Sequence, residues 1–384
     1  ANTVTTGAGA DIITLGTGAD TVTTAAGNDT ITVATANLVS TDTVDGGAGT
    51  DSLILSNAWT VVDADFTNIT NVETLSYGNN AGTLTLGAAS MAAGIVTITD
   101  GTGVTTMTVG AGHTSALTVA LSTGNDSITG SASAAALTVT AAQDSLTTDD
   151  TIVGGSGSSD SLNITGGGTA LAAADMSGVT GVETFLAVTN AALAVTTHDD
   201  NVVAGGTMTV NAAALTTTVF TFTGSNETDG NFTVTTGGTG AHIIILGNGS
   251  DTYTSTNTAG VNTVTATAGN NTITTAAGAD IITLGSGTDT VTTGAAADTI
   301  NSTSANLNLN DTISAGAGTD ILNMTDDSTV IDADFTNVTA VETLTTTAAK
   351  NLDATLGTLA AAAGIVTVTF ADTGASDSLV LAAG

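Results

Sequence analysis

Three consecutive nonapeptides at the start of the chain decide its fold: GAGADIITL (residues 7–15), GTGADTVTT (16–24) and AAGNDTITV (25–33). Each has glycine in its first positions, an aspartate in the fifth, and then a short alternating stretch rich in β-branched residues. Glycine permits the positive φ angles of a tight turn. Alternating β-branched residues favour a strand with one buried face. Each nonapeptide therefore predicts one turn followed by one short strand.

The aspartates of these repeats are strictly spaced. Asp11, Asp20 and Asp29 lie nine residues apart, and Asp42 and Asp51 resume the spacing after an interruption at 34–41. Residues 270–384 repeat residues 1–115 with an offset of 269 and one later insertion, and a looser copy lies at 150–185. Such internal repeats are typical of solenoids. The chain therefore reads as one full unit followed by the start of another.

The pattern divides the chain into four segments. Nonapeptide repeats occupy 1–60 and 241–325, a β-rich solenoid-like region occupies 61–240, and 326–384 copies the segment that follows the first repeats. Between the repeats, apolar and polar residues alternate, as in Thr83-Leu84-Thr85-Leu86, which indicates strands. Only the alanine-rich stretches 88–93 and 359–363 predict a helical turn or two. We therefore expect an all-β chain.

Charge decides which partners the chain excludes. One basic residue, Lys350, stands against 35 acidic ones, for a net charge of -34. Nucleic acid and anionic membranes are excluded, because both require Lys and Arg, and cations are the expected partners. Cysteine is absent, which excludes disulfides and thiolate metal sites, and no apolar stretch is long enough to span a membrane. No catalytic motif is evident, so we expect no enzyme.

The repeated turns carry oxygen ligands that suit calcium. Each turn offers backbone carbonyls and one short carboxylate, and stacking turns about 4.8 Å apart brings the oxygens of neighbouring coils together. Calcium takes about six to eight oxygen ligands in a forgiving geometry. Two alternatives remain: each aspartate caps its own turn without metal, or the acidic surface serves solubility alone. The spacing favours several calcium ions.

The predicted calcium ligands are the turn glycines, whose carbonyls face the turn, and the aspartates that follow them. In the first half of the chain they are Gly7, Gly9, Asp11, Gly16, Gly18, Asp20, Gly27, Asp29, Asp42, Asp45, Gly47, Gly49, Asp51, Asp126 and Asp160. In the second half they are Asp251, Gly278, Asp280, Gly285, Gly287, Asp289, Asp298, Asp311, Gly316, Gly318 and Asp320.

Other polar residues receive other interpretations. Asp65, Asp175 and Asp334 recur in similar segments and are predicted to cap helices or turns. Glu73, Glu183 and Glu342 recur with them, which suggests a structural role or a further ion site. His113, His198 and His242 share no motif and are expected at the surface, although His198-Asp199-Asp200 has the residue types to touch a metal.

GTGADTVTT and its neighbours resemble the nonapeptides of the RTX (repeats-in-toxin) calcium-binding family. The resemblance implies a right-handed parallel β-roll or β-helix solenoid around calcium, with two nonapeptides to each coil. Asp11 and Asp29 would then lie along one edge and Asp20 along the other. The chain departs from the pattern at Ala25, at Asn271 in place of an aspartate, and at His242 in an acidic position. Coils with these departures are expected to bind calcium weakly or not at all.

GGAGTD (46–51) followed by ADFTNITNVETL (64–75) is similar to segments of calcium-dependent bacterial surface-layer proteins. This resemblance implies export by a type I system, an extracellular or cell-surface location, and self-assembly into a layer, sheath or filament. Expected partners are further copies of the chain and a cell-surface polysaccharide. The alternative is a calcium-rigidified extender, or a ligand-binding or ice-binding region, of a large adhesin, because Thr14, Thr23 and Thr32 form a rank of hydroxyls.

Overall fold

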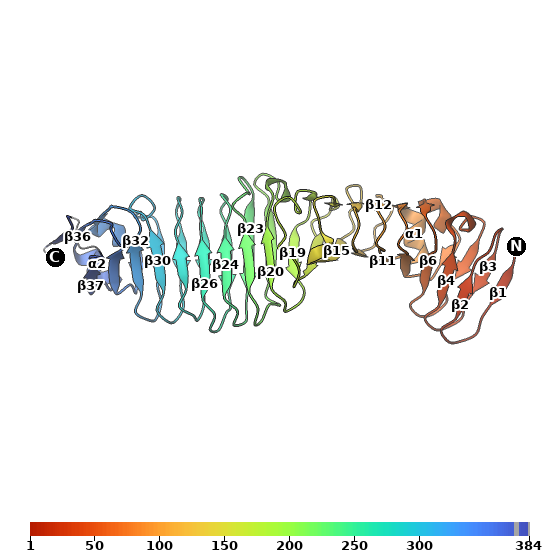
Figure 1. Ribbon diagram of the computed structural model, residues 1–384, viewed down its shortest axis with the longest axis horizontal. Coiled ribbons are helices and arrows are strands. Elements are labelled where there is room, and N and C mark those ends of the chain that lie inside the picture. The colour runs from red at the N-terminus through yellow and green to blue at the C-terminus, as the bar shows by residue number, and fades with distance from the viewer. Residues whose placement is uncertain (372–375, 383–384) are drawn as a thin grey trace. The chain divides into compact units, whose positions relative to one another are not determined.

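The computed structural model describes residues 1–371 and 376–382, and nearly all of their regular structure is parallel β-strand (Figure 1). The chain divides into two compact units, Ala1–Leu186 and Ala187–Gly384. In both units, each strand pairs with the strand one coil later in the sequence. The predicted all-β parallel solenoid is confirmed.

The first unit contains eighteen of these short strands. They are β1 (Thr3–Thr5), β2 (Ile12–Thr14), β3 (Thr21–Thr23), β4 (Thr30–Val33), β5 (Thr43–Asp45), β6 (Ser52–Leu55), β7 (Trp59–Val61), β8 (Ile69–Thr70), β9 (Thr74–Tyr77), β10 (Gly82–Leu86), β11 (Thr97–Thr99), β12 (Thr105–Val109), β13 (Leu117–Ala120), β14 (Ser127–Thr129), β15 (Leu137–Ala142), β16 (Thr151–Val153), β17 (Ser161–Thr165) and β18 (Val179–Thr180). Its helices are α1 (Ala88–Ala93) and the 3-10 turns η1 (Thr35–Asn37), η2 (Asp63–Phe66) and η3 (Gln143–Ser145). Strand β19 (Thr184–Ala187) crosses the boundary between the units.

The strands of the first unit form stacked rows. One row runs β2-β4-β6-β9-β11-β13-β15-β17, a second runs β1-β3-β5-β8, and a third runs β7-β10-β12-β14-β16-β18. The rows alternate along the chain, and most coils contribute strands to two of them; the coil that holds β6, β7 and β8 contributes to all three.

The second unit repeats this organisation. Its strands are β20 (Leu193–Thr196), β21 (Thr207–Ala212), β22 (Phe220–Thr223), β23 (Asn231–Thr236), β24 (His242–Ile245), β25 (Thr252–Ser255), β26 (Asn262–Thr265), β27 (Thr272–Thr274), β28 (Ile281–Thr283), β29 (Thr290–Thr292), β30 (Thr299–Ser302), β31 (Thr312–Ser314), β32 (Ile321–Met324), β33 (Ser328–Ile331), β34 (Val338–Thr339), β35 (Thr343–Thr346), β36 (Leu352–Leu356), β37 (Thr367–Thr369) and β38 (Ser378–Leu381). Its helices are α2 (Thr358–Ala363), η4 (Asp199–Asn201) and η5 (Asp332–Phe335). Odd-numbered strands from β21 to β31, then β34, form one row; even-numbered strands from β20 to β32, then β35 and β37, form another; and β33-β36-β38 form a third.

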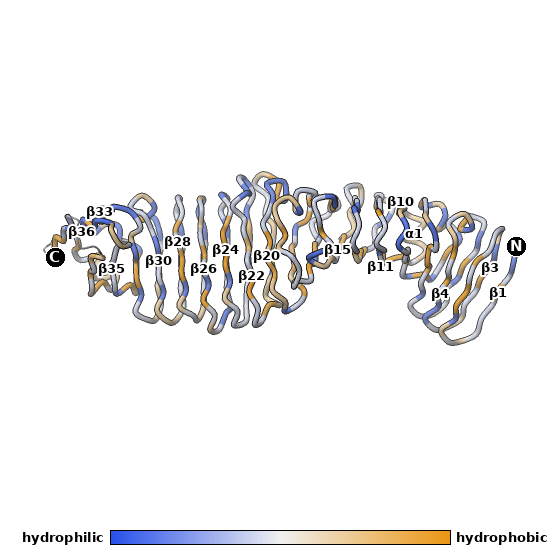
Figure 2. Tube along the Cα trace, in the orientation of Figure 1, coloured by the Kyte–Doolittle hydropathy of each residue, from blue (hydrophilic) through white to orange (hydrophobic). Residues whose placement is uncertain are grey.

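The core is a column of aliphatic side chains stacked in register. Ile13 lies beside Ile31, Ile31 beside Leu53 and Leu53 beside Leu75 in the parallel pairs β2-β4, β4-β6 and β6-β9. The alternating residues on the other face are mostly threonines, and Figure 2 shows the resulting alternation of apolar and polar residues along the coils. Full burial of each such side chain contributes about 1.5–3 kcal/mol. A one-residue slip would turn this column out to solvent, so the register is strongly specified.

Coil length follows the nonapeptides. Where two nonapeptides follow one another the register step is 18 residues, as from Ile12 to Thr30, and longer turns raise the step to 22 from Thr30 to Ser52. The predicted helical stretches are confirmed as α1 and α2, each six residues long. Among the described residues no helix is long and apolar enough to cross a membrane.

Candidate calcium-binding turns

The repeat aspartates form a ladder along the row that begins with β2. The backbone N–H of Asp11 donates to Oδ1 of Asp29, 2.7 Å away, and the N–H of Asp29 donates to Oδ1 of Asp51, also 2.7 Å away. The N–H of Asp51 then donates to Oε2 of Glu73 at 2.8 Å. Each carboxylate sits where a turn enters a strand, and it spans the gap to the preceding coil. The nine-residue spacing thus produces a continuous column of carboxylates.

A second ladder follows the row that begins with β1. Oδ1 of Asp20 accepts the backbone N–H of Asn2 at 2.7 Å, and Oδ1 of Asp42 accepts that of Asp20 at 2.9 Å. Successive nonapeptides therefore alternate between two rows of strands. This confirms the arrangement implied by the resemblance, with Asp11 and Asp29 on one edge and Asp20 on the other.

The second unit contains two equivalent ladders. One runs from Asn262 through Asp280, Asp298 and Asp320 to Glu342, with N–H to side-chain oxygen distances of 2.7–2.8 Å. The other runs from Asp251 through Asn271 and Asp289 to Asp311, at 2.8–3.0 Å. Asn271 keeps the hydrogen bond of the missing aspartate without its charge.

His242 occupies a ladder position as well. Its Nδ1 accepts the backbone N–H of Phe220 at 3.1 Å, and its Nε2 lies 3.0 Å from the carbonyl of Gly237, which makes Nε2 the protonated nitrogen. Burial lowers the pKa of this imidazole. His242 and His113 are fully buried, so the prediction that they lie at the surface is wrong: both serve as internal hydrogen-bonding groups.

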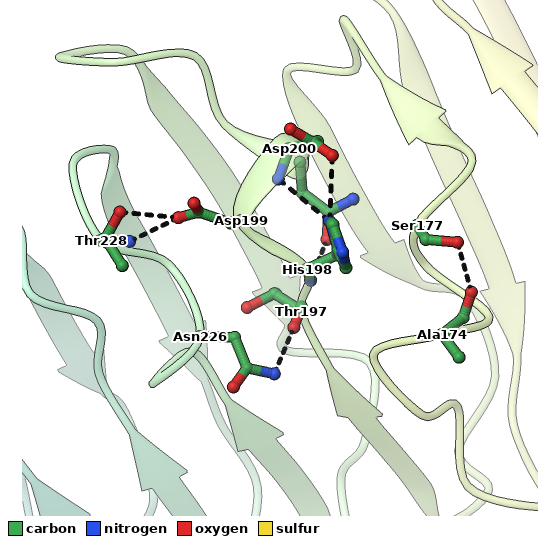
Figure 3. Close-up of polar contacts among 9 residues, drawn as sticks. Ala174, Ser177, Thr197, His198, Asp199, Asp200, Asn226 and Thr228 are labelled. Carbon is green, nitrogen blue, oxygen red and sulfur yellow. Dashed lines mark hydrogen bonds and ion pairs between the residues drawn. The ribbon is translucent and has the colours of Figure 1, made fainter.

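His198 remains partly exposed at the start of η4. Figure 3 shows it beside Asp200, with 3.2 Å between Nδ1 and Oδ2, while Asp199 accepts hydrogen bonds from the backbone N–H and hydroxyl of Thr228. Asp199 and Asp200 thus bind different partners. The suggestion that this tripeptide touches a metal stays a prediction.

Most ladder carboxylates keep one oxygen without any partner. The buried Oδ2 atom accepts no hydrogen bond in Asp11, Asp29, Asp51, Asp126, Asp251, Asp280, Asp289, Asp298 and Asp320. Burying an ionised carboxylate is costly unless a charge or hydrogen bonds compensate it. Only two ion pairs occur in the described part of the chain, His198–Asp200 and Lys350–Asp327, and neither includes a ladder residue. Compensation therefore comes either from a bound proton or from a cation supplied by solution.

Burial raises the pKa of several ladder carboxylates. Desolvation raises the pKa of Asp298 and of Asp251 to about 6, in spite of the backbone N–H groups that bind them. The same cause raises the pKa of Asp51, Asp289 and Asp320. The folded chain therefore holds these carboxylates in their charged form with difficulty unless a cation accompanies them.

The turn glycines form a cradle that a side chain would fill. Gly9, Gly27 and Gly49 have φ angles of 133°, 137° and 150°. A Cβ on Gly49 would lie 1.8 Å from the carbonyl oxygen of Gly27, and one on Gly27 would lie 2.3 Å from that of Gly9. Among the predicted glycines, positive φ is also found at Gly18, Gly47, Gly278, Gly287 and Gly316, but not at Gly7, Gly16, Gly285 or Gly318. Close stacking of carbonyls beside free carboxylate oxygens suits a hard divalent cation.

The described residues contain no group of three or more His, Cys, Asp or Glu side chains that could hold a metal. An ion at these turns would therefore combine one aspartate from a coil with backbone carbonyls. Some predicted ligands use both carboxylate oxygens internally, because Oδ2 of Asp42, Asp160 and Asp311 accepts the N–H of Val39, Gly155 and Asn308. Asp45 binds Gly47 and Asn71. Calcium ligation by each of the predicted residues stays a prediction, and these four have the fewest free oxygens for it.

The acids outside the nonapeptides have clear partners. Asp65, Asp175 and Asp334 each accept the backbone N–H three residues earlier, which confirms them as caps. Glu73, Glu183 and Glu342 each accept the N–H of the aspartate one coil earlier and so end their ladders. Sequence reasoning missed Asp150, which binds the N–H of Asp126 at 2.7 Å. The sequence separation of Asp150 from Asp126, which is about one coil, could have identified it.

One comparison with known proteins gives a match. The family model of the RTX calcium-binding nonapeptide repeat matches residues 1–31, 40–55, 256–291, 284–306 and 310–324, which contain most of the ladder aspartates. No curated protein and no solved structure matches the chain significantly. Repeats of this family bind calcium at multiple sites, and the free carboxylate oxygens described above fit that ion.

Proposed function

We propose that this chain, whose matched coils belong to the RTX calcium-binding nonapeptide repeat family, is a secreted structural protein that folds when it binds calcium and assembles outside the cell. The ladders carry the proposal, because buried carboxylates stacked in neighbouring coils have no cation within the chain. At low calcium a chain with a net charge of -34 repels itself. Metal binding then supplies folding free energy. Export of the unfolded chain by a type I system is consistent with this sequence of events.

The last described strands of the second unit have unpaired edges on which a further coil can stack. Strands β37 and β38 each have one neighbouring strand, β35 and β36. By the internal repeat they correspond to β11 and β12 of the first unit, which pair on their other side with β13 and β14. The last described coil therefore has the sequence of an interior coil. We infer that a further coil, of the same polypeptide or of another copy, stacks on it.

The side chains at this end agree with that inference. Val380 and Leu381 of β38 are 53% and 75% exposed, and Val366 beside β37 is 82% exposed. Exposed apolar residues on an unpaired strand edge favour strand addition. Strands β37 and β38 contain no lysine or arginine to prevent it; the one lysine of the chain, Lys350, precedes β36, one coil before this edge.

The test is a calcium titration followed by circular dichroism, sedimentation velocity and negative-stain electron microscopy on the same samples. The proposal expects a coil-to-β transition and then ordered polymers. The double variant Val380→Lys, Leu381→Lys places charges on the edge, and it should fold with calcium but remain monomeric. The control Val203→Lys changes a residue 71% exposed in a turn and should polymerise normally.

Each other outcome has a definite meaning. A wild-type chain that folds with calcium and stays monomeric contradicts assembly and favours the adhesin extender. A chain already folded in strong chelator contradicts calcium-triggered folding. Polymerisation of the edge variant equal to that of the wild type would show that β38 is not the contact.

A further inference from the structure

Two buried carboxylates meet in the first unit at a place that the family model does not match. Asp100 directly follows β11, and Asp126 directly precedes β14. Thr105 joins them: its hydroxyl donates to Oδ1 of Asp100 at 2.8 Å, and its backbone N–H donates to Oδ1 of Asp126 at 2.7 Å. Asp100 is 8% exposed and Asp126 is 1% exposed. Thr105 therefore links the two carboxylates across neighbouring coils, away from bulk water.

Three buried oxygens around this pair lack a hydrogen bond of ordinary geometry: Oδ2 of Asp100, Oδ2 of Asp126 and the hydroxyl of Tyr77. The polar groups nearest to them belong to the same cluster, because the two carboxylates interact with each other and the phenol interacts with the Thr105 side chain. Tyr77 ends β9, which pairs with β11 so that Ser76 lies opposite Thr99; the same register sets Tyr77 beside Asp100. The phenol is 2% exposed. A buried phenol and two carboxylates would leave such atoms unpaired only at considerable cost.

The backbone leaves room beside Asp126. A Cβ on Gly124 would lie 3.0 Å from both carboxylate oxygens of Asp126 and 2.8 Å from the carbonyl oxygen of Gly103. Because Gly124 has no Cβ, the Gly103 carbonyl oxygen and the Asp126 carboxylate can both lie beside it.

No cation of the chain neutralises the pair. The titratable groups that act on it are Tyr77 and Asp150, both neutral or negative. The pair must therefore hold either a proton or a cation from solution.

We propose that Asp100, Asp126 and the Tyr77 hydroxyl form a separate binding site for a hard cation such as calcium, outside the nonapeptide repeats. Every donor is an oxygen, which is the ligand type that calcium and the lanthanides select. The site joins three successive coils, from β9, β11 and the turn before β14, and its ion would link them where the nonapeptide ladder is interrupted. This site does not depend on assembly of the chain.

The aromatic residues of the chain make this site measurable by itself. Trp59 and Tyr77 lie with ring centroids 4.4 Å apart, and Tyr253 is the only other tyrosine or tryptophan. In a Tyr253→Phe protein, terbium emission sensitised by tyrosine and tryptophan reports an ion near Tyr77. We expect emission that saturates with terbium and disappears when calcium competes.

The variants Asp100→Asn and Asp126→Asn keep the Oδ1 acceptors for Thr105, so the coil should still fold, as circular dichroism would check. Each should weaken terbium binding about tenfold or more. Gly124→Ala fills the space beside Asp126 and should weaken it too. As matched control, Asp298→Asn alters a nonapeptide ladder and should leave the sensitised emission unchanged.

Absence of sensitised emission while the nonapeptide sites are saturated, as measured by equilibrium dialysis, would overturn the proposal and assign the pair to a shared proton. Emission that survives both Asp→Asn variants in folded protein would also overturn it, because terbium would then bind other acids. Either failure leaves the calcium sites of the nonapeptides and the assembly proposal untouched.

Discussion

Replacing Asp298 by asparagine should act with opposite signs in chelator and in calcium. Oδ1 of Asp298 accepts the N–H of Asp280 at 2.8 Å, while its Oδ2 is buried without a partner. Asparagine keeps the first contact and removes the charge. The variant therefore separates the two roles of the side chain, as a ladder rung and as a cation ligand.

The magnitude follows from the pKa. The Asp298 carboxyl has a pKa of about 6 in the folded chain in place of 3.8. This difference means that its ionised form destabilises the fold by at most about 3 kcal/mol, and solvent screening near the turn reduces that energy to about 1–2 kcal/mol. In chelator at about pH 8, where the carboxylate is ionised, the asparagine variant should be more stable by that amount. In calcium at about 100 times its dissociation constant, loss of the ion's stabilisation of about 2.7 kcal/mol should make it less stable than the wild type.

The assay follows folding by circular dichroism in two conditions. In excess chelator, where the chain is expected to be unfolded, a protecting osmolyte induces folding, and in saturating calcium urea reverses it. Asp298→Ala is the control, because it also removes the acceptor and leaves the Asp280 N–H unsatisfied. Compared with Asp298→Asn, the alanine variant should therefore be less stable by about 1–3 kcal/mol in both conditions. An asparagine variant whose stability changes by the same amount with and without calcium would refute the reasoning.

Further outcomes can be measured with the same chain. Because burial raises the pKa of Asp126 to about 7 and that of Asp298 to about 6, their contribution to stability without calcium is full below about pH 4 and is lost as pH rises to about 7. Osmolyte-induced folding in chelator across this range should show the fall, and calcium should abolish it. Gly49 has a φ of 150°, and a Cβ there would lie 1.8 Å from the Gly27 carbonyl oxygen. Gly49→Ala should therefore lower the melting temperature more than Gly9→Ala, whose Cβ meets nothing within 4 Å. Equal decreases in melting temperature would contradict close stacking of the turn glycines. His242 has a lowered pKa, so its contribution to stability depends on pH with the opposite sign. That contribution is present above about pH 6.5 and is lost as pH falls. The imidazole resonance of His242 in NMR should accordingly titrate below that pH.

Much of the fold follows from local pattern. The nine-residue spacing of Asp11, Asp20 and Asp29, with glycines before each and alternating residues after it, predicts short parallel strands, turns and two edges of carboxylates. These features depend on residues close together in the sequence. A coil of two nonapeptides has constant length, so the spacing places equivalent residues above one another without further information.

The sequence by itself thus determined the solenoid, the likeness of its nonapeptides to the RTX repeats and the residue type in each repeated turn. Only the tertiary structure decided which groups complete the ladders, such as Glu73 at one end and His242 within another. It also decided that Tyr77, Asp100 and Asp126 meet. Between the nonapeptide blocks the turns differ in length, so no fixed spacing shows which residues of successive coils lie together. The register of the stacked strands, set by burial of the aliphatic column, makes that choice.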